Sequence, residues 1–288
     1  MTAISAPSCC ACGATMNQRI RSWSYRCPRR HVWASSLDVT INEGSAIDEV
    51  SRELGLETIR HENNQRVLGS LNALRPLKGA RLLDIGSAHG WFIAAAEEYG
   101  ASVAGIEPEE AIAKVSQVPN SIRTGFFPEV LGPEEVFDVI SFNDVLEHLP
   151  DPAAAVKSSF AHLDAGGLLS ISIPDNRGLA FRIAQMFARF GAGGAYDRLW
   201  QKGLQSPHLW YFNEDSLAKL GVKSGFRVAS VRHLPAVARS GLWHRIHMDR
   251  RPSVATRFQF VALLVLSPLL NSAPFSDILH IVLVRPAE

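Results

Sequence analysis

Two acidic residues and a glycine-rich turn form the strongest chemical signal in this 288-residue chain. Asp84 ends the short apolar run ARLLDI and leads into the turn Gly86-Ser-Ala-His-Gly90, while Glu107 ends a second apolar run 21 residues after Gly86. Glycines let the backbone approach a ligand closely, Asp84 can accept hydrogen bonds from a ligand amine, and Glu107 is placed to bind a ribose diol. The pattern indicates a nucleoside cofactor.

The spacing of the glycines separates two kinds of nucleoside cofactor. A dinucleotide site has the pattern G-x-G-x-x-G, with its second glycine where the pyrophosphate passes. Here Ala88 stands at that second position, and the next glycine is Gly90. The spacing therefore disfavours an NAD oxidoreductase, which we keep as an alternative. A tight strand-to-helix turn would be a purely structural explanation of both glycines.

A second candidate site lies near the N-terminus, where all four cysteines of the chain fall within the first 27 residues. Two residues separate Cys9 from Cys12, three separate Cys27 from His31, and 14 separate the two pairs. Thiolate and imidazole ligands at this spacing suit a structural Zn²⁺ ion. A small module with few apolar residues for a core needs the stabilisation that metal binding supplies. Cys10 is a further ligand that could replace Cys9. The structural alternative is four unrelated surface thiols.

Short apolar runs alternate with helical patterns from residue 80 onward. We expect strands at 80–85, 102–106, 137–142, 168–173, 226–231 and 278–284, and helices at 91–99, 109–115, 152–163, 179–190 and 214–224. Strands and helices that alternate at this pace predict an α/β fold with a parallel sheet covered on both faces. Ligands bind such sheets beyond the carboxyl ends of the strands, where Asp84 and Glu107 are expected.

Four motifs between residues 79 and 175 resemble, in order and spacing, those of class I S-adenosylmethionine-dependent methyltransferases. They are LLDIGSAHGWF, VAGIEP, FDVISFNDVLEHLPDP and LDAGGLLSISIPD. The later segments PHLWYFNEDSLAKLGVKSGF and SDILHIVLVRP are similar to those of the group that includes ubiquinone-biosynthesis-type and natural-product O-methyltransferases. The resemblance implies a seven-stranded Rossmann-like sheet whose last strand is antiparallel, and S-adenosylmethionine as cofactor.

The same resemblance implies a set of cofactor-binding residues. They are Asp84, Gly86, Ser87, Gly90, Glu107, Pro108, Phe126, Asn143 and Asp144. The turn at 84–90 would lie under the methionine part, with Asn143 and Asp144 near its end, while Glu107 would bind the ribose and Pro108 would flank the adenine. Many relatives carry an acidic residue after the third strand of the family's sheet, which in this chain would end before residue 125. This chain has Gly125-Phe126-Phe127 there, so Phe126 is expected to hold the adenine by aromatic contact.

Two histidines are candidates for the group that accepts a proton from the methyl acceptor. Methyl transfer from a sulfonium needs positioning and a dry site, but a hydroxyl acceptor often needs a general base. His148 in LEHLPDP and His208 in PHLWYF are the candidates. Structural alternatives are a turn cap or a cofactor contact for His148, and a place in a half-buried aromatic cluster for His208.

The segment around CPRRHVW resembles the N-terminal zinc knuckle of bacterial rRNA guanine-N1 methyltransferases, which implies RNA as a partner. The residues that could grip a backbone or stack bases are Arg19, Arg21, Arg26, Arg29, Arg30, Trp23 and Tyr25. The segments DVLEHLPDP and PHLWYF argue against that family. RNA therefore stays an alternative substrate, and a solvated loop around a zinc staple would explain the arginines equally.

The composition is that of an ordinary globular protein: 47% hydrophobic, 20% charged, with a formal net charge of +1. It offers no chain-wide attraction to nucleic acid or anionic membranes.

The N-terminal residues do not form a signal peptide, so we expect a soluble, cytoplasmic protein. The longest apolar stretch, 258–270, is too short to span a bilayer; preceded by Arg245, Arg250, Arg251 and Arg257, it could lie on a membrane surface, pack on the core or form a homodimer contact.

These observations predict three parts: a zinc-binding module at 1–40, a helical linker or cap at 41–78, and a class I methyltransferase domain at 79–288 with cap insertions around 179–212 and 235–272. The predicted function is methylation, at oxygen, of a small molecule, a glycan or a natural-product intermediate. An RNA methyltransferase and a non-catalytic cofactor-binding scaffold are alternatives. The residues do not identify the acceptor or the oligomeric state, because fold does not determine function.

Overall fold

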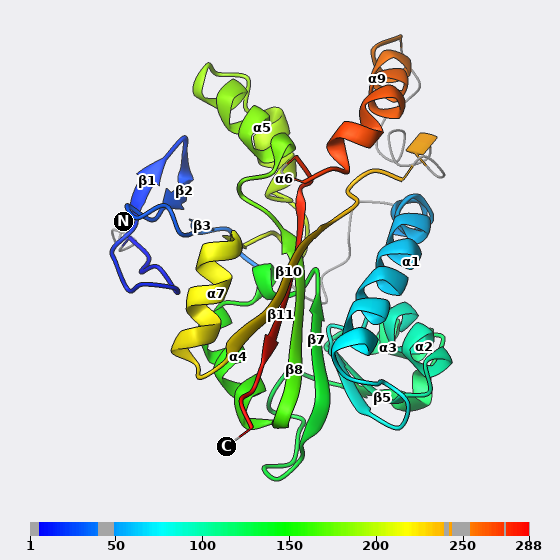
Figure 1. Cartoon of the computed structure of the whole chain (residues 1–288). Coiled ribbons are helices and arrows are strands. Elements are labelled where there is room, and N and C mark those ends of the chain that lie inside the picture. Colours follow the sequence, from blue (N-terminus) through cyan, green and yellow to red (C-terminus); the bar gives the residue numbers. More distant parts are fainter. Residues whose placement is uncertain (1–5, 40–48, 239–241, 244–253, 274, 288) are drawn as a thin grey trace.

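A seven-stranded mixed sheet forms the centre of the computed structural model (Figure 1). The structure describes residues 6–39, 49–238, 242–243, 254–273 and 275–287. In spatial order the strands are β10 (Arg227–Leu234), β11 (Ile278–Val284), β8 (Leu163–Pro174), β7 (Phe137–Asn143), β4 (Arg81–Ile85), β5 (Ser102–Glu107) and β6 (Ile122–Thr124). The predicted α/β fold with a Rossmann-like sheet is confirmed.

The direction of the strands also follows the prediction. Neighbours from β8 to β6 run parallel, whereas β11 is antiparallel to both β8 and β10. One boundary was wrong: the helix expected at 152–163 ends at Ala161, and the strand expected from residue 168 starts at Leu163. The short edge strand β6 had no expected counterpart among the apolar runs.

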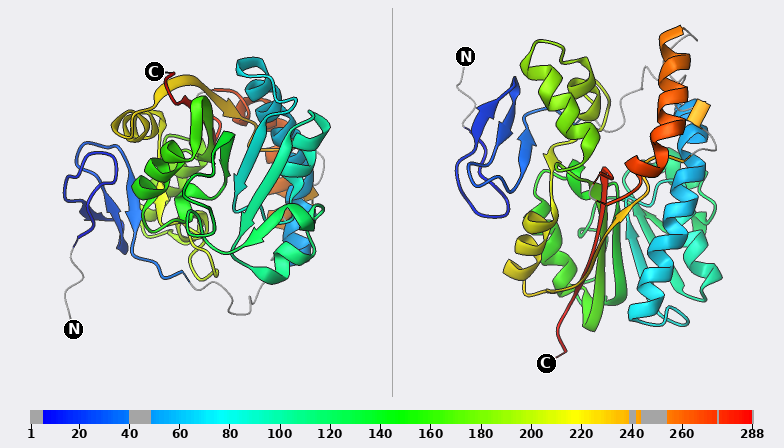
Figure 2. Two further views of the ribbon diagram at one scale, coloured as in Figure 1. Left: turned by 90° about the horizontal axis from the view of Figure 1, so that it is seen from below. Right: turned by 45° about the horizontal axis from the view of Figure 1, so that its top comes forward.

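Helices cover both faces of the sheet (Figure 2). On one face α1 (Glu49–Leu74) packs on α2 (Trp91–Glu98), which contacts β4 and β5. On the other, α4 (Pro152–Ala161) contacts β8, and α7 (Glu214–Lys223) contacts β10 and β11. Successive side chains of a strand point to opposite faces, so Leu82 joins the core under α1 and α2 while Leu83 joins the core that includes Leu217. The short helix α3 (Glu110–Lys114) lies beside β5 and β6.

The N-terminal residues form a small sheet that extends into the rest of the protein. Strands β1 (Asn17–Arg19), β2 (Arg21–Arg26) and β3 (Trp33–Ser35) are joined by β9 (Trp210–Tyr211). The pairing of Trp33 with Tyr211 and of Ala34 with Trp210 links segments that lie far apart in the sequence. The PHLWYF segment therefore contributes a strand to the N-terminal sheet, which the sequence patterns did not reveal.

Three further helices lie beyond the end of the sheet at which the parallel strands terminate (Figure 1). They are α5 (Leu179–Arg189), α6 (Gly194–Leu199) and α9 (Val254–Leu270). An aromatic core of Trp33, Phe181, Tyr196, Trp200 and Tyr211 joins α5 and α6 to the N-terminal sheet. The described helices include none with the length and apolar character needed to cross a membrane. Arg245, Arg250 and Arg251 lie outside the described residues.

Candidate functional site

The carboxyl ends of β4 and β7 bring together the first of the predicted cofactor residues. Asp84 is 2% exposed, and its Oδ1 accepts hydrogen bonds from Ser141 Oγ at 2.6 Å and from Asn143 Nδ2 at 3.0 Å. Burial raises the pKa of Asp84 to about 7, although these two hydrogen bonds oppose the increase. A positively charged ligand group near Asp84 would therefore favour its ionised form.

The turn after β4 requires its two glycines. Gly86 and Gly90 have φ angles of +66° and +74°, in the left-handed region that favours glycine. A Cβ atom on Gly86 would lie 2.5 Å from Cγ2 of Val145, and one on Gly90 would lie 2.3 Å from Oγ of Ser116. Ser87 is buried in the same turn, and its backbone N–H is bonded to β5. The turn is therefore packed tightly against its neighbours and brings the backbone close to the edge of the sheet.

Glu107 closes the other side of this edge. Its Oε2 accepts a hydrogen bond from the backbone N–H of Ala88 at 2.9 Å, and its Oε1 accepts one from the backbone N–H of Glu109 at 3.0 Å. The side chain is 6% exposed, and burial raises the pKa of the carboxyl group. Because each carboxylate oxygen can accept more than one hydrogen bond, Glu107 can hold the turn and a ligand diol together.

The other predicted cofactor residues line the same edge. Pro108 directly follows Glu107 and is half-buried. Phe126 is 56% exposed and comes just after β6, whose Thr124 is paired with Glu107. Asp144 follows Asn143 at the end of β7 in a left-handed conformation, with φ of +56°. The glycine cradle and the two acidic side chains fit a nucleoside cofactor with a cationic amino acid end, while the individual roles stay predictions.

Both predicted histidines lie in a second group, here called the Glu–His cluster: Glu147, His148 and His208. Glu147 and His148 belong to the short helix η2 (Leu146–His148) just after β7, and His208 precedes β9. The imidazole rings of His148 and His208 are 4.7 Å apart between centroids. One ligand atom from each of the three residues lies within 4.8 Å of the others, so the group could hold a metal ion.

Glu147 is the functional candidate that the sequence reasoning missed. It is 1% exposed, and neither carboxylate oxygen has a hydrogen-bond partner among the described residues. Burial raises its pKa well above the usual range for a glutamate, and the charge of Asp144 adds to the increase. A buried carboxylate without a donor calls for a proton or a cation. The signal available in the sequence was its position directly before His148.

Hydrogen bonds define the tautomer of His148. Its Nδ1 lies 2.9 Å from the backbone oxygen of Pro207 and 3.2 Å from Oγ of Ser206. Since a carbonyl oxygen only accepts, Nδ1 carries the proton, and in the neutral ring Nε2 carries the lone pair. His148 is therefore oriented as a proton acceptor at Nε2.

His208 is held at both ring nitrogens. The hydroxyl of Tyr211 donates to the backbone oxygen of Leu199 at 2.7 Å and so accepts from Nδ1 of His208 at 3.1 Å. Nε2 of His208 lies 2.9 Å from Nε2 of Gln201, which donates to it. His208 is also buried, so its surroundings resemble the half-buried aromatic cluster more than those of a mobile base.

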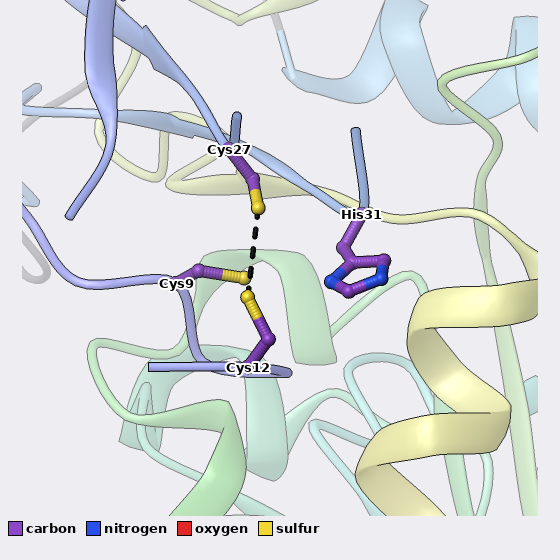
Figure 3. A group of neighbouring side chains, drawn as sticks. All are labelled: Cys9, Cys12, Cys27 and His31. Carbon is purple, nitrogen blue, oxygen red and sulfur yellow. Dashed lines mark hydrogen bonds between the residues drawn. The ribbon is translucent and has the colours of Figure 1, made fainter. Parts of the chain in front are cut away.

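The N-terminal cysteines and His31 meet as the sequence predicts (Figure 3). One ligand atom each from Cys9, Cys12, Cys27 and His31 lies within 4.8 Å of the others, and the Sγ atoms of Cys12 and Cys27 are 3.7 Å apart. Nδ1 of His31 is buried and has no hydrogen-bond partner among the described residues. Cys10 is outside this group. The donor set fits a tetrahedral Zn²⁺ ion.

Hydrogen bonds connect this cysteine group to the segment that carries His208. Ser35 Oγ donates to the backbone oxygen of His208 at 2.8 Å, and the backbone N–H of Ser35 donates to Leu209 at 2.8 Å. Asn213 Nδ2 donates to the backbone oxygen of Arg30 at 3.2 Å. The N-terminal module thus contacts the segment on both sides of β9.

Comparisons with known proteins agree with this fold. The family described as a methyltransferase domain matches residues 59–231, more than half of the chain. The possible histamine N-methyltransferase of Thermotoga maritima is 16% identical, with a TM-score of 0.55, and the match covers 83% of this chain and 95% of that one. The magnesium protoporphyrin IX methyltransferase of Synechocystis, solved with S-adenosylhomocysteine, is 15% identical over 85% of this chain and 90% of that one, with a TM-score of 0.52.

The chain therefore belongs to the methyltransferase-domain family and has the fold of class I S-adenosylmethionine-dependent methyltransferases. Within the family it is similar to a ubiquinone biosynthesis O-methyltransferase of Paracidovorax citrulli, with 32% identity over 142 residues. That match covers 46% of this chain and 60% of the relative, so the similarity extends over little more than half of the relative's length.

Proposed function

We propose that this chain transfers a methyl group from S-adenosylmethionine to a hydroxyl oxygen of a small organic molecule. The observation that carries the proposal is the Glu–His cluster, which follows β7 directly after Asn143 and Asp144. A lone pair on Nε2 of His148 and a buried carboxylate are suited to activating a hydroxyl group. The similarity to ubiquinone biosynthesis O-methyltransferases supports oxygen as the acceptor atom.

Each group has a distinct task in this proposal. When bound, S-adenosylmethionine supplies a methyl group on a sulfonium, which leaves as a neutral thioether. Glu107 and the turn at Gly86 hold the nucleoside, and Asp84 favours the positively charged amino acid end. His148 accepts the hydroxyl proton at Nε2 while the acceptor oxygen forms its bond to the methyl carbon. His208 keeps the cluster in place through Gln201 and Tyr211.

A divalent cation bound by the Glu–His cluster is the second candidate for activating the acceptor. The favouring observation is the Glu147 carboxylate, whose two oxygens lack donors among the described residues. A carboxylate with two imidazoles is a common donor set for a divalent metal, and a bound cation would lower the pKa of a coordinated hydroxyl. Coordination by Nε2 of His208 would replace its hydrogen bond from Gln201. In that case His148 would be a ligand and not a base.

The test is an assay of S-adenosylhomocysteine release with catechol and simple phenols as probe acceptors. We expect turnover with a hydroxyl acceptor, and its loss in His148→Gln with His61→Gln as the control, since His61 is exposed on α1. Binding of S-adenosylhomocysteine without turnover of any acceptor would favour the non-catalytic scaffold. If activity survives a chelator, His148 acts as the general base. If activity is lost on chelation and restored by one divalent metal, a cation bound by the Glu–His cluster activates the acceptor.

We also propose that Cys9, Cys12, Cys27 and His31 bind one structural Zn²⁺ ion. The converging ligand atoms and the orphaned Nδ1 of His31 support this. Metal analysis of the purified protein is expected to give one zinc per chain, reduced in Cys12→Ser and kept in the matched variant Cys10→Ser. Equal zinc content in both variants would overturn the assignment.

The exposed faces of α5 and α9 favour an apolar or lipid-linked acceptor presented at a membrane surface. Phe190 is 84% exposed, and Phe187, Phe258, Val261 and Val265 are exposed as well. Large apolar side chains gathered on exposed helices mark interaction surfaces. Co-flotation with anionic vesicles, lost in Phe190→Ser and in Phe258→Ser, would support membrane contact. If these faces instead form a homodimer contact, the mass of the protein in solution should halve in the same variants. The unmodified protein should then not float with the vesicles.

A further inference from the structure

A basic cavity lies between the N-terminal sheet and α5. Its volume is about 470 Å³, and its lining consists of Arg19, Ile20, Arg26, Trp33, Ala188 and Arg189. Figure 1 shows β1 and β2 beside α5, the elements that supply the three arginines. The cavity shares no residue with the Glu–His cluster or with the cofactor edge, the name used here for the predicted cofactor residues at the ends of β4, β5, β6 and β7: Asp84, Gly86, Ser87, Gly90, Glu107, Pro108, Phe126, Asn143 and Asp144. Neither the methyl-transfer proposal nor the zinc site gives these arginines a role.

The positive charge in this cavity is not neutralised by the residues around it. The lining contains no acidic side chain, and within the described part of the chain neither Arg19, Arg26 nor Arg189 forms an ion pair. The neighbouring Arg21 is paired with Asp197 at 2.8 Å, so a carboxylate of this region is already engaged.

Arg26 is held in position but lacks a partner for one of its donors. Its guanidinium carbon lies 5.1 Å from the centre of the Trp33 ring, a cation–π contact. Its Nε atom is buried and has no hydrogen-bond partner among the described residues. A buried N–H without an acceptor, at the wall of a cavity with two more guanidinium groups, is the arrangement that an anion would satisfy.

We propose that this cavity binds the phosphate or diphosphate group of a small organic phosphate, through Arg19, Arg26 and Arg189. Guanidinium groups bind phosphate oxygens in a bidentate manner, and the partly exposed Ile20 offers apolar surface for the rest of the ligand. The proposal is independent of methyl transfer. It assigns Arg19 and Arg26 of the N-terminal module, together with Arg189 of α5, to a compact anion.

The aromatic residues of the module favour a small phosphate over an RNA strand. Base stacking needs open aromatic faces. Trp33 is buried beneath Arg26, Tyr25 is buried, and Trp23 is stacked on Tyr196 with ring centroids 5.8 Å apart. These rings are occupied by the protein itself, so the module presents charge without a platform for bases.

The test is calorimetric titration of the full-length, zinc-loaded protein with pyrophosphate and with uridine diphosphate. We expect saturable binding that Arg19→Gln and Arg189→Gln each weaken by about tenfold, the loss typical of one charged hydrogen-bonding partner. Both residues are exposed, so these variants should fold even if Arg26→Gln does not. Arg182→Gln is the matched control, because Arg182 is exposed on α5 but does not line the cavity.

Tighter binding of uridine diphosphate than of pyrophosphate would support the proposal and show that the apolar wall contributes. Equal binding would support it for the phosphate groups alone. The proposal would be overturned by absence of binding, by equal weakening in Arg182→Gln, or by a short single-stranded RNA that binds through these arginines and that pyrophosphate does not displace. Binding of S-adenosylhomocysteine should be unchanged in all of these variants, so failure here leaves the methyl-transfer proposal standing.

Discussion

The cofactor edge and the Glu–His cluster both include residues at or just after the carboxyl end of β7, yet they are built in opposite ways. At the edge the carboxylates of Asp84 and Glu107 accept hydrogen bonds from side chains and backbone of adjacent strands and their turns. In the cluster the carboxylate of Glu147 has no donor among the described residues. The carboxylates of the edge already have hydrogen-bond donors from the protein. The carboxylate of Glu147 would instead be neutralised by a proton or by a bound cation.

The two regions also differ in what supports them. The edge depends on neighbouring strands of one sheet. The cluster depends on His208, whose segment is paired with β3 of the N-terminal module and bonded to Ser35. From this difference we expect that variants can disturb the proposed cofactor binding and the proposed acceptor activation separately.

The largest effect is expected from Glu107→Ala at the edge. The variant removes the carboxylate predicted to bind the ribose and also releases the backbone of Ala88 and Glu109. We expect affinity for S-adenosylhomocysteine to fall about 100-fold, as for the loss of two hydrogen bonds to a charged group. Calorimetry measures this, with the exposed Glu110→Ala as control. Unchanged affinity would remove Glu107 from the cofactor site.

Variants of the cluster should show the converse behaviour. Glu147→Gln and His148→Gln are expected to lower kcat by about 100-fold, a common loss for a general base, while affinity for S-adenosylhomocysteine stays within about twofold. Parallel kinetic and calorimetric measurements check this separation. A loss of cofactor affinity equal to that of Glu107→Ala would show that the two regions form one site.

The pH dependence of cofactor binding offers a finer comparison. Burial raises the pKa of Asp84 to about 7, so this carboxyl group is largely protonated below that pH and ionised above it. The ligand ammonium favours the ionised form, so affinity for S-adenosylhomocysteine should rise up to about tenfold between about pH 6 and about pH 8. Glu107, whose pKa is also raised, acts in the same direction. Asp84→Asn should flatten the profile, and affinity that falls with rising pH would contradict the assignment.

The smallest effect is expected where the N-terminal module contacts α6. Arg21 and Asp197 form an ion pair with N–O distance of 2.8 Å, and each side chain is 29% exposed. A double-mutant cycle with Arg21→Gln and Asp197→Asn, followed by urea unfolding, should give a coupling free energy of about 0.5 kcal/mol. The same variants should alter turnover more than cofactor affinity. Equal changes in both would show that the module supports the whole domain and not the cluster in particular.

Much of the fold was predictable because its signals are local. The run ARLLDI, the turn at Gly86 and the acidic Glu107 follow one another at spacings typical of parallel strands and their turns, so a parallel sheet with candidate ligand residues at its strand ends could be expected. Ile278–Val284 was assigned correctly as a strand for the same reason. The cysteine spacing likewise identified a group of four ligands that the structure brings together.

The sequence by itself determined the α/β sheet, its cofactor edge and the pairing of Cys9 and Cys12 with Cys27 and His31, because each depends on neighbours in the chain or on hydrophobic periodicity. Only the tertiary structure decided that Trp210–Tyr211 of PHLWYF forms a strand with the N-terminal module and that three arginines surround one cavity. The same holds for Glu147, which is buried beside His148 and His208 without a donor among the described residues. These features arise from contacts between segments far apart in the chain. Such contacts depend on burial and register across the whole fold, which residue spacing does not encode.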